Sequence, residues 1–421
     1  MTSEPTEAFV WTWLPGAEEP VVAGRLELAG GIVSFNYGRS YLAHPDAIPL
    51  YLPELPLRPG AMAPLGGLTI PGCIKDAGPD AWGQRVVMQH LLGAGAKGGH
   101  PAVFSPLTYL LRSGSNRIGA LDFQDRADIH VSYDEMTATL SELMQAADRV
   151  SEGRQLSPAL DLALLHGSSV GGARPKALLK DHDHDLIAKF SSSTDTYAVV
   201  KGEFAAMELA RRAGLTAAGV ELKQVMGRDV LLVERFDRVP GTKQRRALVS
   251  ALTILGLDEM MARYASYADL AQMVRERFVD ARVTLRELFA RIIFNILTGN
   301  SDDHARNHAA FWDGERLTLT PAYDICPQSR AGGETSQAMM IGTDGFRMSQ
   351  LAGCLQRAST YMLTESDARE LIDHQVEVIE REWREVCGLA QMTEIDRSFF
   401  WGRQFLNPYA FEGYSAAPVQ P

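Results

Sequence analysis

The chain reads Gly299-Asn-Ser-Asp-Asp-His-Ala-Arg-Asn307 and, after a short interval, Thr320-Pro-Ala-Tyr-Asp-Ile325. An amphipathic pattern precedes the first stretch, because apolar residues recur at 285, 288, 289, 292, 293 and 296 before Gly299 ends the repeat. Two carboxylates and an amide therefore follow an expected helix, and Asp324 lies on an apolar segment that predicts a strand. This order of elements is the strongest functional signal in the chain.

Asp302, Asn307 and Asp324 have the side chains that a magnesium–nucleotide site needs. Mg²⁺ prefers hard oxygen ligands, usually one or two carboxylates completed by substrate phosphates. Protein kinases place an Asp to accept the proton of the attacking hydroxyl, an Asn five residues later, and a distant metal-binding Asp. Asp302 and Asn307 have that separation, and Asp324 can take the third place. The alternative is that Asp302 and Asp303 cap a turn while Asn307 satisfies a loop backbone.

A glycine-rich stretch earlier in the chain reads Gly167-Ser-Ser-Val-Gly-Gly-Ala-Arg-Pro-Lys176. Such a turn ahead of a strand lets backbone N–H groups approach a phosphate without interference from side chains. It is not a Walker A sequence, because the Gly-Lys-Ser/Thr ending is absent, and a flexible glycine loop is an equal alternative. Phosphorylation of its serines would add negative charge and repel a bound nucleotide.

Residues 176–190 predict a β-hairpin, because two short apolar runs flank the polar turn 181–185. That turn resembles a metal cluster, but a solvated hairpin tip explains it better. Lys189 lies at the end of the second strand, where kinases carry a lysine over the phosphates; a snorkelling surface lysine is the alternative. Glu234 and Phe236 follow a buried strand, where a kinase hinge contacts adenine. An edge-strand ion pair would explain them as well.

Composition limits the class of protein. The 421 residues carry 41 basic and 52 acidic side chains, for a formal net charge of −11, so no global positive field draws the chain to nucleic acid or an anionic membrane. Four scattered cysteines without a Cys-x-x-Cys pair predict neither a zinc knuckle nor a disulfide framework. No apolar stretch reaches the roughly 18–20 residues of a membrane helix. We expect a cytoplasmic protein with no membrane partner.

The patterns along the chain predict three parts. Residues 1–125 read as mixed α/β, with strands near 9–13 and 32–37 and a helix that follows Asp80 and ends at Gly93. Residues 126–240 form a second α/β part that includes the glycine-rich stretch. Residues 241–421 read as helical, and the chain from about Asn407 onward is expected to be frayed.

Taken together, these ordered motifs resemble the HipA family, the serine/threonine kinase toxins of bacterial toxin–antitoxin modules. The resemblance rests on Pro79–Trp82, Arg117–Ala120, Gly167–Lys176, Val233–Arg238, Asp302–Asn307 and Tyr323–Ile325. It implies an α+β fold with two lobes, like protein kinases and their lipid-kinase branch. The expected parts are an extra N-terminal subdomain over 1–125, a mixed α/β N-lobe with the phosphate loop over 126–240, and an all-helical C-lobe over 241–421.

The resemblance also implies ATP and Mg²⁺ as cofactors and gives roles to residues. Asp302 corresponds to the catalytic base, and Asn307 and Asp324 correspond to the metal ligands. The implied ATP contacts are Val170, Gly171, Gly172, Ala173, Lys176, Lys189, Glu234, Phe236, His304, Asn307 and Asp324. Ser169 corresponds to an inhibitory autophosphorylation site, and Ser168 is a second candidate.

Partners are implied in the same way. Family members phosphorylate cytosolic proteins, aminoacyl-tRNA synthetases among them, and pair with a helix-turn-helix antitoxin, so we expect DNA as a partner only indirectly. Asp303 departs from the family's glycine and could compete with Asp302, and Pro175 stiffens the phosphate loop. Two other functions stay open: a non-catalytic, nucleotide-binding partner of a DNA-binding antitoxin, and a small-molecule phosphotransferase with the same Asp–Asn–Asp chemistry.

Overall fold

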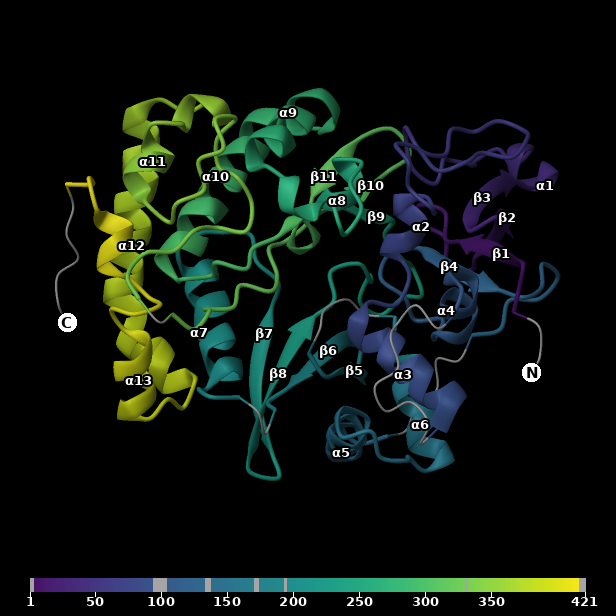
Figure 1. Cartoon of the computed structure of the whole chain (residues 1–421), viewed down its shortest axis with the longest axis horizontal. Coiled ribbons are helices and arrows are strands. Elements are labelled where there is room, and N and C mark those ends of the chain that lie inside the picture. The colour runs from purple at the N-terminus through teal and green to yellow at the C-terminus, as the bar shows by residue number, and fades with distance from the viewer. Residues whose placement is uncertain are drawn as a thin grey trace. The chain divides into compact units, whose positions relative to one another are not determined.

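The computed structural model describes residues 4–93, 104–132, 138–169, 174–192, 195–330 and 332–415 (Figure 1). The chain divides into two compact units. Unit 1 consists of Met1–Ser192, Lys223–Val249 and Phe311–Glu315, and unit 2 of Ser193–Leu222, Ser250–Ala310 and Arg316–Pro421. The predicted division into three parts, with boundaries after residues 125 and 240, stays a prediction.

The first sheet of unit 1 has four strands in the order β3-β2-β1-β4, and its neighbouring strands are antiparallel. The strands are β1 (Glu7–Thr12), β2 (Val21–Ala29), β3 (Ile32–Tyr37) and β4 (Leu121–Gln124). Gly30 and Gly31 join β2 to β3 with φ angles of 58° and 81°, which glycine adopts without a steric penalty. The strands predicted near 9–13 and 32–37 are thus confirmed.

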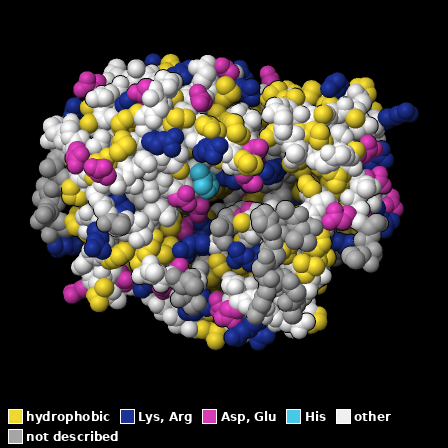
Figure 2. Space-filling view, in the orientation of Figure 1, with side chains coloured by type: hydrophobic (Ala, Val, Ile, Leu, Met, Phe, Trp, Pro, Cys, Tyr) yellow, Lys and Arg dark blue, Asp and Glu magenta, His cyan; other side chains and the backbone are white. Residues whose placement is uncertain are grey.

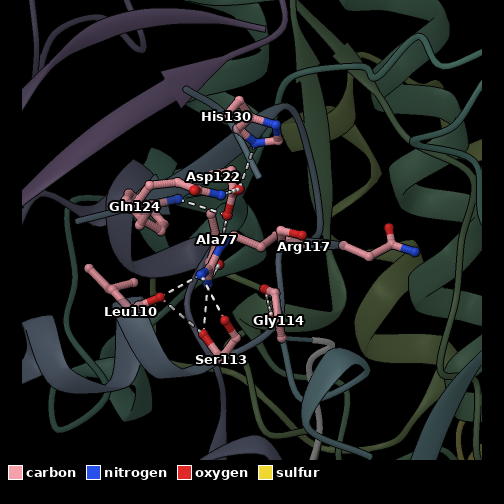
Figure 3. A network of polar contacts seen from close by, with 12 residues as sticks. Ala77, Leu110, Ser113, Gly114, Arg117, Asp122, Gln124 and His130 are labelled. Atoms are coloured by element: carbon pink, nitrogen blue, oxygen red, sulfur yellow. Dashed lines mark hydrogen bonds and ion pairs between the residues drawn. The ribbon is translucent and has the colours of Figure 1, made fainter. Parts of the chain in front are cut away.

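Three short helices accompany this sheet: α1 (Arg39–Leu42), α2 (Gly72–Asp76) and α4 (Pro106–Arg112). Arg117, which lies between α4 and β4, forms a fully buried ion pair with Asp122 of β4 (Figure 3). Arg117 Nε donates to Asp122 Oδ1 at 2.8 Å, and Asp122 Oδ2 accepts from Gln124 Nε2 at 2.9 Å and lies 2.8 Å from His130 Nε2. These bonds compensate for the lost hydration of both charges.

A second sheet has the order β5-β6-β8-β7. Its strands are β5 (Lys176–Asp181), β6 (His184–Phe190), β8 (Arg228–Glu234) and β7 (Val220–Val225), and the chain passes from unit 2 to unit 1 within β7. The predicted hairpin is confirmed as β5 and β6, and the side chain of His182 at its tip is 95% exposed. The 181–185 turn is therefore solvated.

Three helices of unit 1 cover this sheet: α3 (Ala81–Leu92), α5 (Leu140–Ser151) and α6 (Pro158–His166). Their apolar side chains share one core with the strands, in which Trp82, Val86 and Leu143 pack with Phe190 and Leu232. α3 begins at Asp80, whose side chain accepts a hydrogen bond from the backbone N–H of Gly83 at 3.1 Å, and it ends at Gly93. The helix predicted to follow Asp80 is confirmed.

Unit 2 is mainly helical. Its helices are α7 (Val199–Arg212), α8 (Ala251–Ile254), α9 (Tyr267–Arg277), α10 (Ala281–Leu297), α11 (Leu351–Leu355), α12 (Glu365–Leu389) and α13 (Glu394–Phe400), with short 3-10 turns η3 (Ala262–Tyr264), η4 (Ala305–Asn307), η5 (Ala358–Tyr361) and η6 (Pro408–Phe411). α7 packs along α12 (Figure 1). The predicted amphipathic helix is α10, and all six predicted apolar positions are fully buried.

Two expectations for residues 241–421 need correction. Three short strands, β9 (Leu248–Ser250), β10 (Ala309–Trp312) and β11 (Leu317–Leu319), interrupt the helices and form a sheet of order β11-β10-β9, so this part is not helical throughout. The chain after Asn407 is also not frayed as far as Ser415. Tyr409, Phe411 and Tyr414 are buried, because their rings supply apolar surface that outweighs the Pro/Gly-rich composition.

Among the described residues, no helix is long and apolar enough to cross a bilayer. Figure 2 shows that acidic and basic side chains of the described residues are interspersed over the visible face.

Candidate functional site

The predicted catalytic segment of unit 2 follows directly from the end of α10. Gly299 has a φ of 68°, and a Cβ atom there would come within 2.8 Å of the carbonyl oxygen of Gln404. Both the backbone angle and the close approach therefore require glycine at this position. After this turn, Asp302 is exposed whereas Asp303 and Asn307 are buried. Two carboxylates that are adjacent in sequence thus differ in exposure to solvent.

Asp303 is held inside unit 2 by three side chains. Its Oδ2 atom accepts hydrogen bonds from Tyr267 Oη and from Asn295 Nδ2 at 2.7 Å, and it lies 2.7 Å from His308 Nε2. Asn295 belongs to α10, Tyr267 begins α9, and His308 directly follows η4. The carboxylate thus ties the predicted catalytic segment to two helices. Asp303 therefore has a structural role, and Asp302 is the exposed carboxylate of the two.

The pKa of the Asp302 carboxyl is raised above its ordinary value of 3.8. Partial desolvation by the surrounding protein is the main cause, and the negative charges of Asp324 and Asp303 act in the same direction, whereas His304 lowers the pKa. A raised pKa makes a carboxylate a stronger proton acceptor. Several negative groups near one another also favour the approach of a cation.

The expectation that Asp324 lies on a strand is wrong: β11 ends at Leu319, and Asp324 lies in the left-handed backbone region with a φ of 60°. Non-glycine residues in this region carry strain, although Asp tolerates it better than most, and such residues cluster at functional sites. The flanking residues are fixed: Ala322 and Ile325 are buried, and Tyr323 Oη donates to the carbonyl oxygen of Arg306 at 2.7 Å. The Asp324 segment is therefore bonded to the predicted catalytic segment of the same unit.

The donor set of unit 2 fits Mg²⁺ with its nucleotide. Among the described residues, no group of three His, Cys, Asp or Glu side chains is arranged to hold a metal ion, but Mg²⁺ on a nucleotide uses only one or two carboxylates. Asp324 and Asn307 offer one carboxylate and one amide oxygen. In addition, Nδ1 of His304 is buried without a hydrogen-bond partner in the part of the chain that the structure describes, and a bound ligand could satisfy it.

The predicted phosphate-contacting residues belong to unit 1. Val170, Gly171, Gly172 and Ala173 lie outside the described residues. Lys176 is buried at the start of β5, and Lys189 is half-buried on β6 directly opposite it. The structure therefore brings the two predicted lysines together within one hairpin.

Ser168 and Ser169, the predicted phosphorylation sites, are both buried. Ser168 Oγ donates to the carbonyl oxygen of Leu165 and Ser169 Oγ to that of Gly114, both at 2.7 Å. In this conformation neither hydroxyl faces solvent. A phosphate could reach Ser169 only after its segment had moved away from Gly114.

The predicted hinge residues alternate with a buried charge cluster. Glu234 is partly exposed, and its Oε1 atom lies 3.0 Å from His184 Nδ1. Phe236 is half-buried, and its ring packs edge-to-face on the ring of Phe311. Between and beyond them, Arg235, Asp237 and Arg238 are buried.

These buried charges bind the segment that carries the Arg117 motif. The side chains of Arg235 and Arg238 both donate to the carbonyl oxygen of Arg117 at 2.6 Å, and Asp237 Oδ2 accepts from the Gly119 N–H at 2.8 Å. Burial by itself would raise the pKa of Asp237, but the two guanidinium groups lower it below its ordinary value. Three of the six residues of the Val233–Arg238 motif thus hold two segments of unit 1 together.

Comparison with known proteins identifies the family. Residues 168–383, just over half of the chain, match the family described as the HipA-like C-terminal domain. The chain belongs to the HipA family. The resemblance to the HipA family that the motifs indicated is confirmed, and the matched range includes the Asp302–Asn307 and Tyr323–Ile325 motifs.

Relatives of this HipA-family chain are distant. The protein Y4mE of Sinorhizobium fredii is 30% identical over 147 residues, which are 33% of each chain. The serine/threonine-protein kinase toxin HipA of Shewanella oneidensis is 27% identical over 186 residues, which are 37% of this chain and 42% of that one. The chain thus matches less than half the length of either relative.

The fold likeness covers nearly the whole chain. HipA in the Shewanella oneidensis complex of HipA, HipB and operator DNA superposes with a TM-score of 0.68, at 19% identity, over 93% of this chain and 94% of that one. This likeness shows the HipA fold and confirms the predicted α+β, kinase-like class.

Sequence reasoning missed the partners of Asp303 in this HipA-family chain. Tyr267 lies on α9, Asn295 on α10 and His308 directly after η4, so no regular spacing connects the three. A buried Asn within the apolar face of α10 was an available signal, because a polar residue there needs a partner. A helix was predicted to follow Asp80, but the Asp80 side chain was not identified as its cap, although Asp before a helix is a typical N-cap residue.

Proposed function

We propose that this HipA-family protein is a serine/threonine protein kinase toxin that transfers the γ-phosphoryl group of ATP to a cytosolic protein, with the aminoacyl-tRNA synthetases as the candidate substrate class. The observation that carries the proposal is the arrangement in unit 2, where an exposed Asp302 with a raised pKa is placed near the strained Asp324. The chemistry of this pair matches the base and the metal ligand of kinases. A relative named as a kinase toxin adds support.

In the proposed reaction, Asp302 accepts the proton of a serine or threonine hydroxyl on the substrate protein. The hydroxyl oxygen then bonds to the γ-phosphorus, and the bond to the ADP oxygen breaks. Asn307 and Asp324 would hold Mg²⁺, which when bound neutralises charge on the phosphates. Asp303 does not act as the base, because its Oδ2 is occupied by three side chains.

The remaining predicted contacts serve the nucleotide. Lys176, Lys189 and the backbone of residues 170–173 would hold the phosphates, and His304 is also a proposed ATP contact. Glu234 and Phe236 would contact adenine. Their support is the sequence pattern and, for the lysines, their opposition across one hairpin.

Regulation by phosphorylation is part of the same proposal. Phosphate on Ser169, or alternatively on Ser168, would silence the kinase, because a group with about −1.5 to −2 charges cannot occupy the buried position of either hydroxyl. The glycine-rich segment would have to leave its place against Gly114, and the ATP contacts would be lost with it.

A helix-turn-helix antitoxin is the proposed partner, and DNA would be reached only through it. The support is the complex of HipA, HipB and operator DNA in which the fold neighbour was solved. The net charge of −11 agrees with an indirect contact to DNA. We place the protein in the cytoplasm, where its proposed substrates are.

The test is phosphate transfer from labelled ATP by wild type and by Asp302→Asn, followed by phosphoproteomics of cells that express either form. We expect label on a protein with wild type and a loss of at least about 1,000-fold with Asp302→Asn, as for removal of a catalytic base with its proton-transfer role. Equal transfer by both would remove Asp302 as the base. Label on a metabolite would favour a small-molecule phosphotransferase. ATP binding without any transfer, together with antitoxin binding, would favour a non-catalytic partner.

A further inference from the structure

Lys176 is an almost fully buried cation in unit 1. Only 2% of its side chain is exposed. A buried ammonium group is costly unless a negative charge lies near it. Lys176 is also proposed to hold an ATP phosphate. The residue that fixes its side chain before ATP binds therefore determines whether the ammonium group is already in position.

Asp80, the N-cap residue of α3, supplies such a charge. Its Oδ2 lies 3.7 Å from Lys176 Nζ, while its Oδ1 accepts the hydrogen bond from the Gly83 N–H at 3.1 Å. One carboxylate oxygen is thus fixed by the helix, and the other is near the lysine. A separation of 3.7 Å gives strong attraction in a buried place but is longer than a hydrogen bond.

The same turn of α3 also holds the backbone of Lys176. Trp82 Nε1 donates to the Lys176 carbonyl oxygen at 3.0 Å, and the Trp82 ring is fully buried. The side chain and the main chain of the lysine are therefore both positioned by residues next to each other at the start of α3.

A third contact reaches the other flank of the glycine-rich stretch. A Cβ atom on Gly83 would come within 1.7 Å of the Ser168 carbonyl oxygen, so the backbone of α3 lies directly against that residue. Residues 80–83 consequently contact the chain both before and after residues 170–173.

From these contacts we infer that Asp80 is a positioning residue of the nucleotide site, which holds the buried Lys176 ammonium in place for the ATP phosphates. The inference rests on the proposed ATP-dependent function. It assigns the Pro79–Trp82 landmark, which precedes the second sheet by many residues, an indirect part in nucleotide binding through Lys176.

The test is a double-mutant cycle with Asp80→Asn and Lys176→Met, each measured for the KM for ATP, kcat and the urea midpoint of unfolding. Asn caps a helix about as well as Asp, so the substitution keeps the cap and removes the charge. The matched control is Asp280→Asn, because Asp280 caps α10 in the same way through the Val283 N–H. It lies at the opposite end of α10 from the predicted catalytic segment.

We expect Asp80→Asn to raise the KM for ATP at least about tenfold with a much smaller change in kcat, and Asp280→Asn to leave both within about twofold. In the Lys176→Met background, Asp80→Asn should change the KM less than twofold, because the lysine through which it acts is gone. An equal change in both backgrounds would show a merely structural role and overturn the inference. So would an unchanged KM in an active enzyme. If wild type neither binds nor uses ATP, the proposed function itself fails.

Discussion

Lys176 on β5 and Lys189 on β6 are direct cross-strand partners. Opposed residues of an antiparallel pair point to the same face with Cβ atoms about 4.5–5.5 Å apart, and like charges there weaken the sheet. The other charged pair in this hairpin, Lys180 and Asp185, has opposite signs. Two lysines side by side at the end of the hairpin next to the glycine-rich stretch are suited to an anionic ligand. Without that ligand, their repulsion lowers the stability of the protein.

Lys189→Met should therefore separate binding from stability. We expect ATP affinity to fall at least about tenfold, while the free energy of unfolding without nucleotide stays constant or rises by roughly 0.2–1 kcal/mol as the repulsion is removed. Isothermal titration with Mg²⁺–ATP and urea unfolding measure the two effects. Lys180→Met is the control, because it breaks an opposite-charge pair and should lower stability slightly without changing ATP affinity. A marked loss of stability in Lys189→Met would contradict this account.

Gly83→Ala should destabilise unit 1, although alanine normally stabilises a helix. The added Cβ would collide with the Ser168 backbone, which cannot move as a flexible side chain does, and we expect a loss of about 1–3 kcal/mol. Gly388→Ala in α12 is the matched control, because nothing lies within 4 Å of a Cβ there. That variant should gain up to about 1 kcal/mol. Urea unfolding compares the two, and effects of the same sign would refute the close contact.

Asp303→Asn should be more damaging than its conservative chemistry suggests. The substitution removes the charge that Tyr267, Asn295 and His308 surround, and we expect a loss of about 2–4 kcal/mol in stability together with reduced phosphate transfer. Tyr267→Phe removes one donor only and should cost about 1–2 kcal/mol. If Asp303→Asn left stability unchanged and abolished transfer alone, Asp303 would have a direct chemical role instead.

Acid should remove the stability that two buried carboxylates of unit 1, Asp122 and Asp237, contribute. The pKa values of Asp122 and Asp237 are lowered in the folded protein, despite burial, by His130 and Arg117 and by Arg235 and Arg238 respectively. The unfolded chain therefore binds more protons than the folded one just below the ordinary value of 3.8. Stability from these groups is complete above that pH and is lost as the pH falls through the lowered values.

Urea unfolding between about pH 6 and pH 3 measures this dependence. The free energy of unfolding should decline below about pH 4.5 as protons enter the unfolded chain. Asp237→Asn should be less stable at neutral pH and should show a shallower decline. A free energy that stays level over this range would contradict the assignment.

Much of the fold could be predicted where its signals are local. The stripe from Leu285 to Ile296 and its end at Gly299 predicted α10, and the two apolar runs around the 181–185 turn predicted the β5–β6 hairpin. The spacing of Asp302, Asn307 and Asp324 likewise needed no tertiary information. The small sheet β11-β10-β9 was missed because its strands have only three or four residues, too few for a period-two pattern to emerge.

The supporting contacts could not be predicted, because they join residues far apart in sequence. Trp82 and Lys176 are 94 residues apart, and their contact depends on how α3 packs on the second sheet. The burial of Asp303 depends on α9 and α10 together. A single sequence contains the groups that react but not the packing that decides which of two neighbouring carboxylates is exposed.

The hydrogen bonds between the segment around Arg117 and residues 235–238 also determine how early unit 1 can complete its folding during synthesis. Asp237 binds the backbone of Gly119, 118 residues earlier in the chain. At about 5–20 residues per second, a ribosome adds those residues in roughly 6–24 s. During that interval the backbone near Gly119 lacks its native partners from residues 235–238, so the first unit of a nascent chain stays incomplete. The first unit can close only after the ribosome has passed the arginines that hold it.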